Sequence, residues 1–204
     1  MFVRQVQNQF RIANADVQMF YQDSIWSKPT GVSQIYMMLI GAGGAGGSGC
    51  GSGAVTTWWG AAQNVPDSLK IHPGTGASNN TTVSYVGSST TDLLTANSGT
   101  SATTGASAMT ANQFSASGFF QSVAGQNGTA TTVAASTTTF LSGGCSGTTI
   151  TSNYGYGTVE QGIFQLQPVI VGTGSVTANK AGIGCGAGNA SGSGGTGFIL
   201  IASW

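Results

Sequence analysis

The sequence predicts an all-β domain, a sandwich or jelly-roll-like fold with glycine-rich segments. β-branched residues dominate, good helix formers are scarce, and short apolar stretches alternate with clusters of Gly, Asn and Ser. Glycine accounts for 34 of the 204 residues and gathers in dense clusters. Charged residues make up 5% of the chain and hydrophobic residues 40%. Disordered chains combine low hydrophobicity with high charge, so this composition favours a folded protein.

Seven stretches have the length and composition of strands. In chain order they are residues 32–40, 54–59, 68–72, 81–86, 92–96, 164–171 and 198–204. We expect Trp58 and Trp59 to point to opposite faces of their strand, one into the core and one out of it. His72 is expected at the end of its strand, because Pro73 and Gly74 follow it.

Two parts of the chain differ from this pattern. Residues 1–25 hold four of the ten charged side chains and form either an N-terminal attachment segment or the first strand of the domain; residues 26–204 form the glycine-rich β domain. Residues 97–150 are low in complexity and resemble a linker. The phenylalanines spaced along them favour a loop-rich outer part of the fold with a thin core.

The glycines predict close packing of backbone on backbone. Read in threes, residues 41–53 place glycine on two of three threads, as in a polyproline-II-like helix with three residues per turn. Residues 47–53 (GSGCGSG) and 182–188 (GIGCGAG) also alternate with period two, which would make strands with one bare side. The positions expected in close packing are Gly41, Gly43, Gly44, Gly46, Gly47, Gly182, Gly184, Gly186 and Gly188.

The central cysteines of these two segments, Cys50 and Cys185, are expected to face each other, as two small buried side chains or as a disulfide. The third cysteine is Cys145, and none of the spacings is typical of a metal site.

The same glycines fit G-x-G-x-x-G, the motif of a dinucleotide-binding turn. That motif needs a following helix to hold the pyrophosphate, and no helix of the required length can start after Gly46. The chain has one histidine, His72, and five carboxylates, no two of them close in sequence. We therefore expect no enzyme, no metal and no cofactor.

Aromatic residues beside hydroxyls and amides are typical of sugar-binding surfaces. Tyr154 and Tyr156 lie in Asn153-Tyr154-Gly155-Tyr156-Gly157, which has the composition of a loop tip. These two tyrosines are the candidates for contact with a receptor or glycan. No basic patch is present, so binding to nucleic acid or to anionic membranes is not expected.

Two end motifs carry a resemblance to a known family. Residues 26–32 read WSKPTGV and residues 195–204 read GTGFILIASW, with VPDSLKI at 65–71 and DLLTA at 92–96 between them. This order resembles the glycine-rich domain of bacteriophage tail-fibre and other virion surface proteins, over residues 20–204. In that domain a W-x-x-P-x-G-V strand comes first and a G-x-G strand ending in an aromatic residue comes last.

The resemblance implies a virion structural protein at the particle surface: a short fibre, a spike or a capsid decoration, with a contribution to host attachment. It also implies assembly in the host cytoplasm, contact with other capsid or tail proteins, and a homo-oligomer, by expectation a trimer. The alternative is a carbohydrate-binding adhesin of a tail-fibre tip, which would bind a host surface glycan. A signal peptide is not visible in the first residues, which agrees with assembly inside a host cell.

Overall fold

The computed structural model describes residues 15–45, 50–76, 79–87, 92–100, 104–109, 114, 117–125, 127, 156–159, 166–170, 183–184, 186 and 193–204. These residues form two antiparallel sheets and a separate two-stranded ribbon, and the described part contains no α-helix. The prediction of an all-β fold is confirmed.

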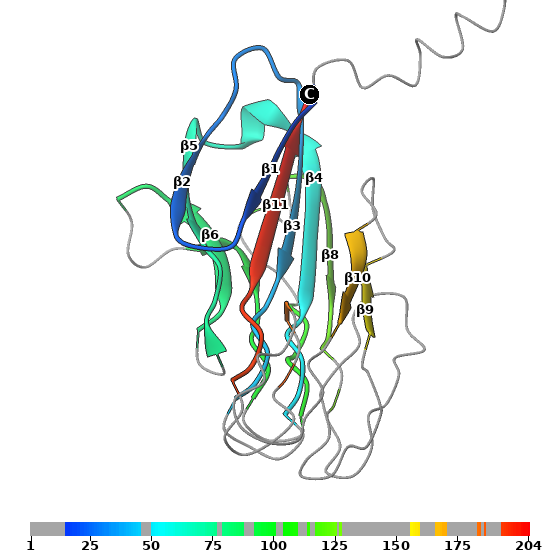
Figure 1. Cartoon of the computed structure of the whole chain (residues 1–204). Coiled ribbons are helices and arrows are strands. Elements are labelled where there is room, and N and C mark those ends of the chain that lie inside the picture. Colours follow the sequence, from blue (N-terminus) through cyan, green and yellow to red (C-terminus); the bar gives the residue numbers. More distant parts are fainter. Residues whose placement is uncertain are drawn as a thin grey trace, which may run out of the picture.

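Sheet A has five strands and sheet B has four (Figure 1). The order in sheet A is β1 (Asp16–Phe20), β11 (Phe198–Ser203), β3 (Gln34–Ile40), β4 (Val55–Ala61) and β8 (Phe119–Val123). The order in sheet B is β2 (Ser24–Ser27), β5 (Ser68–His72), β6 (Thr81–Tyr85) and β7 (Asp92–Ala96). The ribbon pairs β10 (Leu166–Ile170) with β9 (Tyr156–Val159), and η1 (Ala62–Asn64) is a short 3-10 turn.

One apolar core joins the two sheets, as expected of a β-sandwich. Sheet A contributes the inward side chains of β3, including Met37 and Leu39, together with Trp58 of β4. Sheet B contributes Trp26 of β2 and Leu69 of β5, all of them buried. Because alternate side chains of a strand point to opposite faces, these positions follow directly from the alternation of the strands.

The seven predicted strands are all present, with end points that differ by a few residues. The strands at 68–72 and 92–96 have the predicted bounds. Trp58 is fully buried and Trp59 is 44% exposed, so the inward and outward prediction for this pair is confirmed. His72 is the last residue of β5, as predicted.

Four strands, β1, β2, β8 and β9, lie outside the seven predicted stretches. Residues 16–20 of the N-terminal segment form β1, an edge strand paired with β11, while residues 1–14 lie outside the described residues. Residues 24–27 form β2. Within the low-complexity stretch, Phe119–Val123 form β8 and pair with β4, so part of that stretch belongs to the sandwich.

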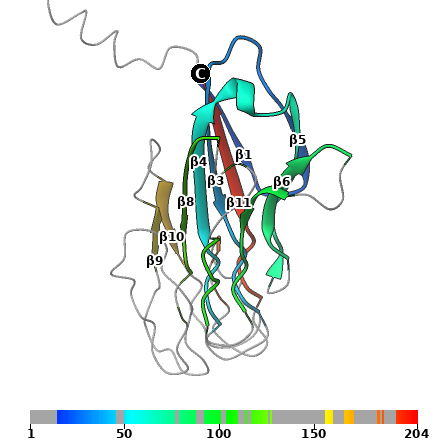
Figure 2. The ribbon, with the colours of Figure 1, turned by 180° about the vertical axis from the view of Figure 1, so that it is seen from behind.

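At one end of sheet A, the chain continues beyond the strands as extended backbone that is not part of the sheet. Figure 1 and the view from behind in Figure 2 show these continuations running together, away from the end of the sheet where the C-terminus lies. They follow β3, precede β4 and β11, and are joined by the continuation of β7 from sheet B. Both sheets therefore lead into one bundle of glycine-rich segments.

Candidate functional site

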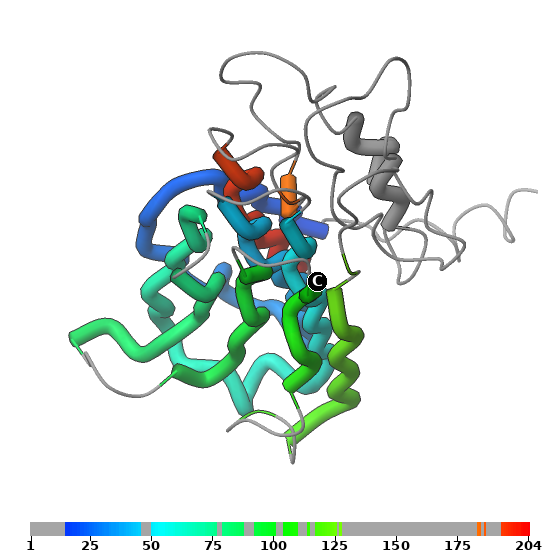
Figure 3. Tube along the Cα trace, turned by 90° about the horizontal axis from the view of Figure 1, so that it is seen from below, coloured from blue at the N-terminus to red at the C-terminus, as the bar shows by residue number. Residues whose placement is uncertain are grey.

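The glycine bundle is the feature that sets this fold apart from a plain sandwich. We define it as residues 41–45, 50–54, 97–100, 104–106 and 193–197, with Gly125, Gly184 and Gly186. Segments far apart in the sequence gather side by side in the view from below (Figure 3). Most of the hydrogen bonds that join them run from backbone to backbone.

The hydrogen bonds of residues 41–44 repeat every three residues. Gly41 N–H donates to the carbonyl oxygen of Ala54 (2.8 Å) and Gly44 N–H to that of Gly51 (2.9 Å), so both reach the same neighbouring segment. Gly43 N–H donates to Gly195 (2.9 Å), in a second segment. A strand would direct its bonds within one plane with period two, whereas a polyproline-II-like helix turns by a third of a turn per residue.

A third direction completes the pattern. The carbonyl oxygen of Ala42 accepts a hydrogen bond from Gly99 N–H (2.8 Å), which belongs to the continuation of β7. Residues 41–44 thus bond to three different neighbours through successive residues. This is the packing of polyglycine-II-like helices, with period three.

Residues 50–54 occupy a central place in the bundle. Ala54 N–H donates to Asn97 (2.9 Å), Gly53 N–H donates to Gly184 (2.8 Å), and the carbonyl oxygen of Ser52 accepts from Ala106 N–H (2.9 Å). The period-two strand predicted for 47–53 is therefore wrong at the described residues 50–53. Neighbouring segments surround residues 50–54 on several sides. A backbone with three residues per turn directs its hydrogen bonds to each of them in succession.

The second period-two prediction, for 182–188, is also wrong where the structure describes it. Gly184 lies in a turn with φ of +72° and cannot continue an extended strand. Its N–H donates to Thr196 (2.9 Å) while its carbonyl oxygen accepts from Gly53. The turn thus links the segment before β4 to the segment before β11.

Glycine is required in the bundle because neighbouring carbonyl groups occupy the space of a side chain. A Cβ on Gly41 would overlap the carbonyl oxygen of Asn97, and one on Gly44 would overlap that of Thr100. A Cβ on Gly186 would overlap the carbonyl oxygen of Cys50. The same holds, each against another backbone oxygen, for Gly51, Gly53, Gly99, Gly125 and Gly194.

Of the nine glycines singled out by the sequence, five lie in the described part of the bundle: Gly41, Gly43, Gly44, Gly184 and Gly186. Gly46, Gly47, Gly182 and Gly188 lie outside the described residues, as do Cys145 and Cys185. Cys50 is buried in the bundle.

The amides that a dinucleotide would need are engaged within the bundle. Anion sites use backbone N–H groups that point to the ligand. Here the N–H groups of Gly41, Gly43 and Gly44 donate to other segments of the protein. In addition β3 and β4 are antiparallel neighbours, so they cannot form the parallel βαβ unit of a dinucleotide fold.

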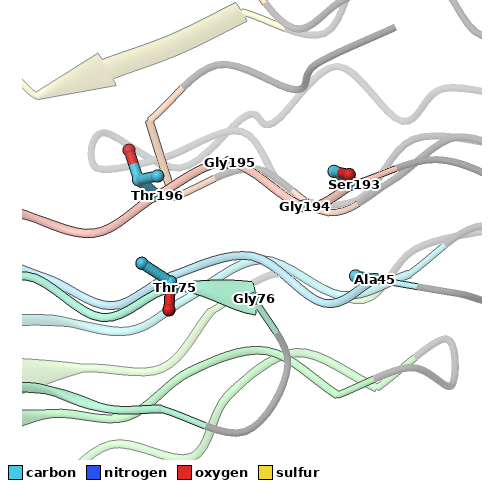
Figure 4. A pocket seen from close by; sticks show the side chains of 7 residues that line it. All are labelled: Ala45, Thr75, Gly76, Ser193, Gly194, Gly195 and Thr196. Atoms are coloured by element: carbon cyan, nitrogen blue, oxygen red, sulfur yellow. The ribbon is translucent and has the colours of Figure 1, made fainter. Parts of the chain in front are cut away.

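A pocket of about 490 Å³ lies beside the bundle (Figure 4). Its lining consists of Ala45, Thr75, Gly76 and residues 193–196. Thr75 and Ala45 lie on one side of the pocket and residues 193–196 on the other. No lining residue is titratable. Such a pocket can accept and donate hydrogen bonds to a neutral ligand, but it offers no acid or base.

Four of the six described Asp and Lys side chains lie in two other places. His72 Nδ1 lies 2.6 Å from Asp23 Oδ1, beside a depression of about 380 Å³ that Lys70 and Ile25 also line. Lys28 Nζ donates to the carbonyl oxygens of Ala62 (3.3 Å) and Val65 (2.7 Å) and pairs with Asp67 (2.9 Å). Lys28 directly follows β2, so the second group fastens the 3-10 turn η1 to the end of β2. This is a structural role.

Of the two candidate receptor contacts, Tyr154 lies outside the described residues and Tyr156 is the first residue of β9. The loop tip predicted around residues 153–157 is therefore wrong at Tyr156, where strand pairing with Ile170 begins. Among the described residues, no group of three or more His, Cys, Asp or Glu side chains could hold a metal ion. No helix in the described part of the chain has the length and apolar character to cross a membrane.

Comparison with known proteins gives no family for this chain. No protein-family model matches the sequence, and no curated protein matches it.

Proposed function

We propose that this chain is a structural protein at the surface of a bacteriophage particle, a short fibre, spike or capsid decoration. The observation that carries the proposal is the glycine bundle, in which period-three hydrogen bonds join continuations of both sheets. Such a bundle needs no charged or catalytic side chains, because backbone hydrogen bonds join its segments. The order of the end motifs, which resembles glycine-rich virion domains, agrees with this role.

In this role the chain would be assembled in the host cytoplasm and carried in the virion as a homo-oligomer, by expectation a trimer, in contact with capsid or tail proteins. Charged residues amount to 5% of the chain, so contact with nucleic acid or anionic lipid is not part of the proposal. No enzymatic activity is proposed either.

The test is the composition of purified particles. Particles of the virus that encodes the chain are separated on a density gradient, and the chain is quantified by mass spectrometry against the major capsid protein. We expect a constant ratio across the particle peak, and antibody labelling at the particle surface. A chain that stays in the soluble fraction of the lysate, with none in the particle peak, would contradict the proposal.

The second candidate is a glycan-binding adhesin, and the pocket beside the bundle favours it. Its lining of small, uncharged residues suits a neutral ligand such as a sugar (Figure 4). Thr75→Phe would fill the pocket. Thr30→Phe, at an exposed turn residue that does not line this pocket, serves as the control. On a glycan array, loss of a signal in the first variant alone would support a site here. Loss only in a Tyr154→Ala, Tyr156→Ala double variant would place the contact at those residues instead.

A further inference from the structure

Aromatic side chains gather at one end of sheet A, on the outer face that is turned away from sheet B. Trp59 of β4 and Phe119 of β8 lie opposite each other, and their neighbours Trp58 and Phe120 belong to the core on the inner face. Trp59 is 44% exposed and Phe119 is 68% exposed. The ring of Trp204, the residue after β11, lies 6.4 Å from that of Trp59 between centroids and is inclined to it by 40°. We call Trp59, Phe119 and Trp204 the aromatic platform.

The aromatic platform lies at the end of sheet A that is opposite the glycine bundle. Phe119 is the first residue of β8, and Trp204 lies at the C-terminal end of the chain, which Figure 1 marks. Toward the bundle the same face is covered, because Tyr36 and Met38 are only 5% and 0% exposed. The platform is therefore an exposed aromatic surface at one end of a face that is otherwise buried in its middle.

Gln34 places a hydrogen-bonding group beside these rings in a fixed orientation. Trp59 Nε1 donates to Gln34 Oε1 (3.1 Å), and because an indole N–H can only donate, the oxygen of the amide must face it. The Nε2 group of Gln34, with its two N–H donors, then points away from the indole and has no partner among the described residues. Gln121, on the same face of β8 and two residues beyond Phe119, adds a second exposed amide.

Exposed rings next to amide donors suit a neutral sugar. One face of a pyranose presents C–H groups, whose partial positive charge is attracted to the negative face of an aromatic ring. The rim of the same sugar carries hydroxyl groups, which accept hydrogen bonds from amide N–H groups. A ligand that stacks on Trp59 thus brings its hydroxyl groups within the reach of Gln34.

Other classes of ligand match this surface less well. A purely apolar ligand would bury the amide donors of Gln34 and Gln121 without partners, which costs free energy. An acidic ligand would find no cation, because none of the described strand residues on the outer face of sheet A is charged. A neutral ligand with both C–H faces and hydroxyl groups satisfies the rings and the amides together.

We propose that the aromatic platform is a stacking site for a neutral sugar, with Gln34 as the hydrogen-bond donor to its hydroxyl groups. This inference rests on the second candidate function, glycan binding, and gives it a site that is separate from the pocket beside the bundle and from Tyr154 and Tyr156. The role in the virion can fail or hold independently, because a chain that is found in particles but binds no sugar would overturn this site alone.

The positions of the four tryptophans give this site a readout of its own. Trp26 and Trp58 are 1% and 0% exposed, so iodide in solution quenches chiefly the emission of Trp59 and Trp204. The full chain is screened on an array of neutral oligosaccharides with their sialylated counterparts, and iodide quenching is then measured with the neutral oligosaccharide that binds best. We expect at least one neutral oligosaccharide to bind and to protect the tryptophan emission from iodide. A sugar in the pocket beside the bundle would leave the quenching unchanged.

Three variants remove parts of the site. Phe119→Ala and Trp59→Ala should each weaken binding by about tenfold or more, because each removes a ring on which the sugar stacks. Gln34→Glu keeps an acceptor for Trp59 Nε1 but removes the N–H donors, so it should also weaken binding. Tyr85→Ala removes a 41% exposed aromatic residue from sheet B and is the matched control, which should bind as the wild-type chain does.

Circular dichroism and thermal unfolding show whether each variant is folded, and Phe119→Ala, at the more exposed position, decides the test where Trp59→Ala prevents folding. An array on which no neutral oligosaccharide binds would overturn the proposal. So would binding that leaves iodide quenching unchanged, binding that survives in the folded platform variants, or binding that Tyr85→Ala weakens equally. A sialylated oligosaccharide that binds more tightly than its neutral counterpart would overturn the choice of a neutral ligand.

Discussion

The carbonyl oxygen of Asn97 occupies the space in which a Cβ on Gly41 would stand. Gly41 N–H donates at the same time to Ala54, and Ala54 N–H donates to Asn97, so three segments meet at this point. The bundle cannot shift locally to make room for a side chain here, because a hydrogen bond to another segment holds each of these backbone groups in place. Glycine at position 41 is a requirement of packing rather than of chain flexibility.

Gly41→Ala should therefore lower the free energy of unfolding by more than about 3 kcal/mol, or prevent folding. The new methyl group would overlap backbone atoms, which cannot move aside as a flexible side chain could. Gly31→Ala is the control. Gly31 has φ of +84° but nothing within 4 Å of its Cβ position, so its cost should be near 1 kcal/mol from backbone strain alone. Urea denaturation of both variants checks the difference, and equal costs would contradict the packing argument.

Lys28 should stabilise the fold more than its ion pair suggests. Its side chain is 18% exposed and donates to two carbonyl oxygens, whereas that of its partner Asp67 is 94% exposed. Lys28→Met should cost about 1–3 kcal/mol because the carbonyl groups of Ala62 and Val65 lose a charged donor. Asp67→Asn removes only an exposed charge and should cost less than about 1 kcal/mol. Thermal unfolding of the two variants distinguishes the effects; an equal loss would mean that the ion pair carries the stability.

The two buried core tryptophans should respond differently to replacement by phenylalanine. Trp58 Nε1 donates to the carbonyl oxygen of Phe114 (2.8 Å) inside the core. Trp26 Nε1 is buried with no hydrogen-bond partner among the described residues. Both changes remove similar volume, so Trp58→Phe should cost about 1–2 kcal/mol more than Trp26→Phe. Chemical denaturation measures this, and a Trp26→Phe variant that is the less stable of the two would contradict it.

Tyr36 should make the fold sensitive to alkaline pH. Burial raises the pKa of Tyr36 from 10.0 to about 12. Above pH 10 the unfolded chain loses this proton while the folded chain keeps it, so stability is complete below pH 10 and falls as the pH rises toward 12. The slope is about 1.4 kcal/mol per pH unit, or about 2–3 kcal/mol in all. Tyr36→Phe should flatten this part of the profile, measured by denaturation at several pH values. An unchanged slope would assign the effect to other groups.

Much of the sandwich could be predicted because its strands carry their signal locally. The strands at 68–72 and 92–96 combine alternation with clear turn residues at both ends, and Trp58 and Trp59 divide between the two faces because side chains in a strand alternate. The strand Phe119–Val123 was missed since serine and glycine surround it and its partner, β4, lies some sixty residues earlier in the chain. For residues 1–25, the charged and amide side chains left an attachment segment and a first strand as alternatives, and it is the pairing with β11 that makes residues 16–20 a strand.

The sequence by itself determined that the chain is a charge-poor β protein and that its glycines serve close backbone packing. Only the tertiary structure decided the period of that packing. A glycine has no side chain to mark a face, so the sequence of residues 47–53 fits both period three and period two. The choice falls to the neighbours: residues 97–100, 104–106 and 193–197 approach from different sides, and only a backbone with three residues per turn can bond to all of them.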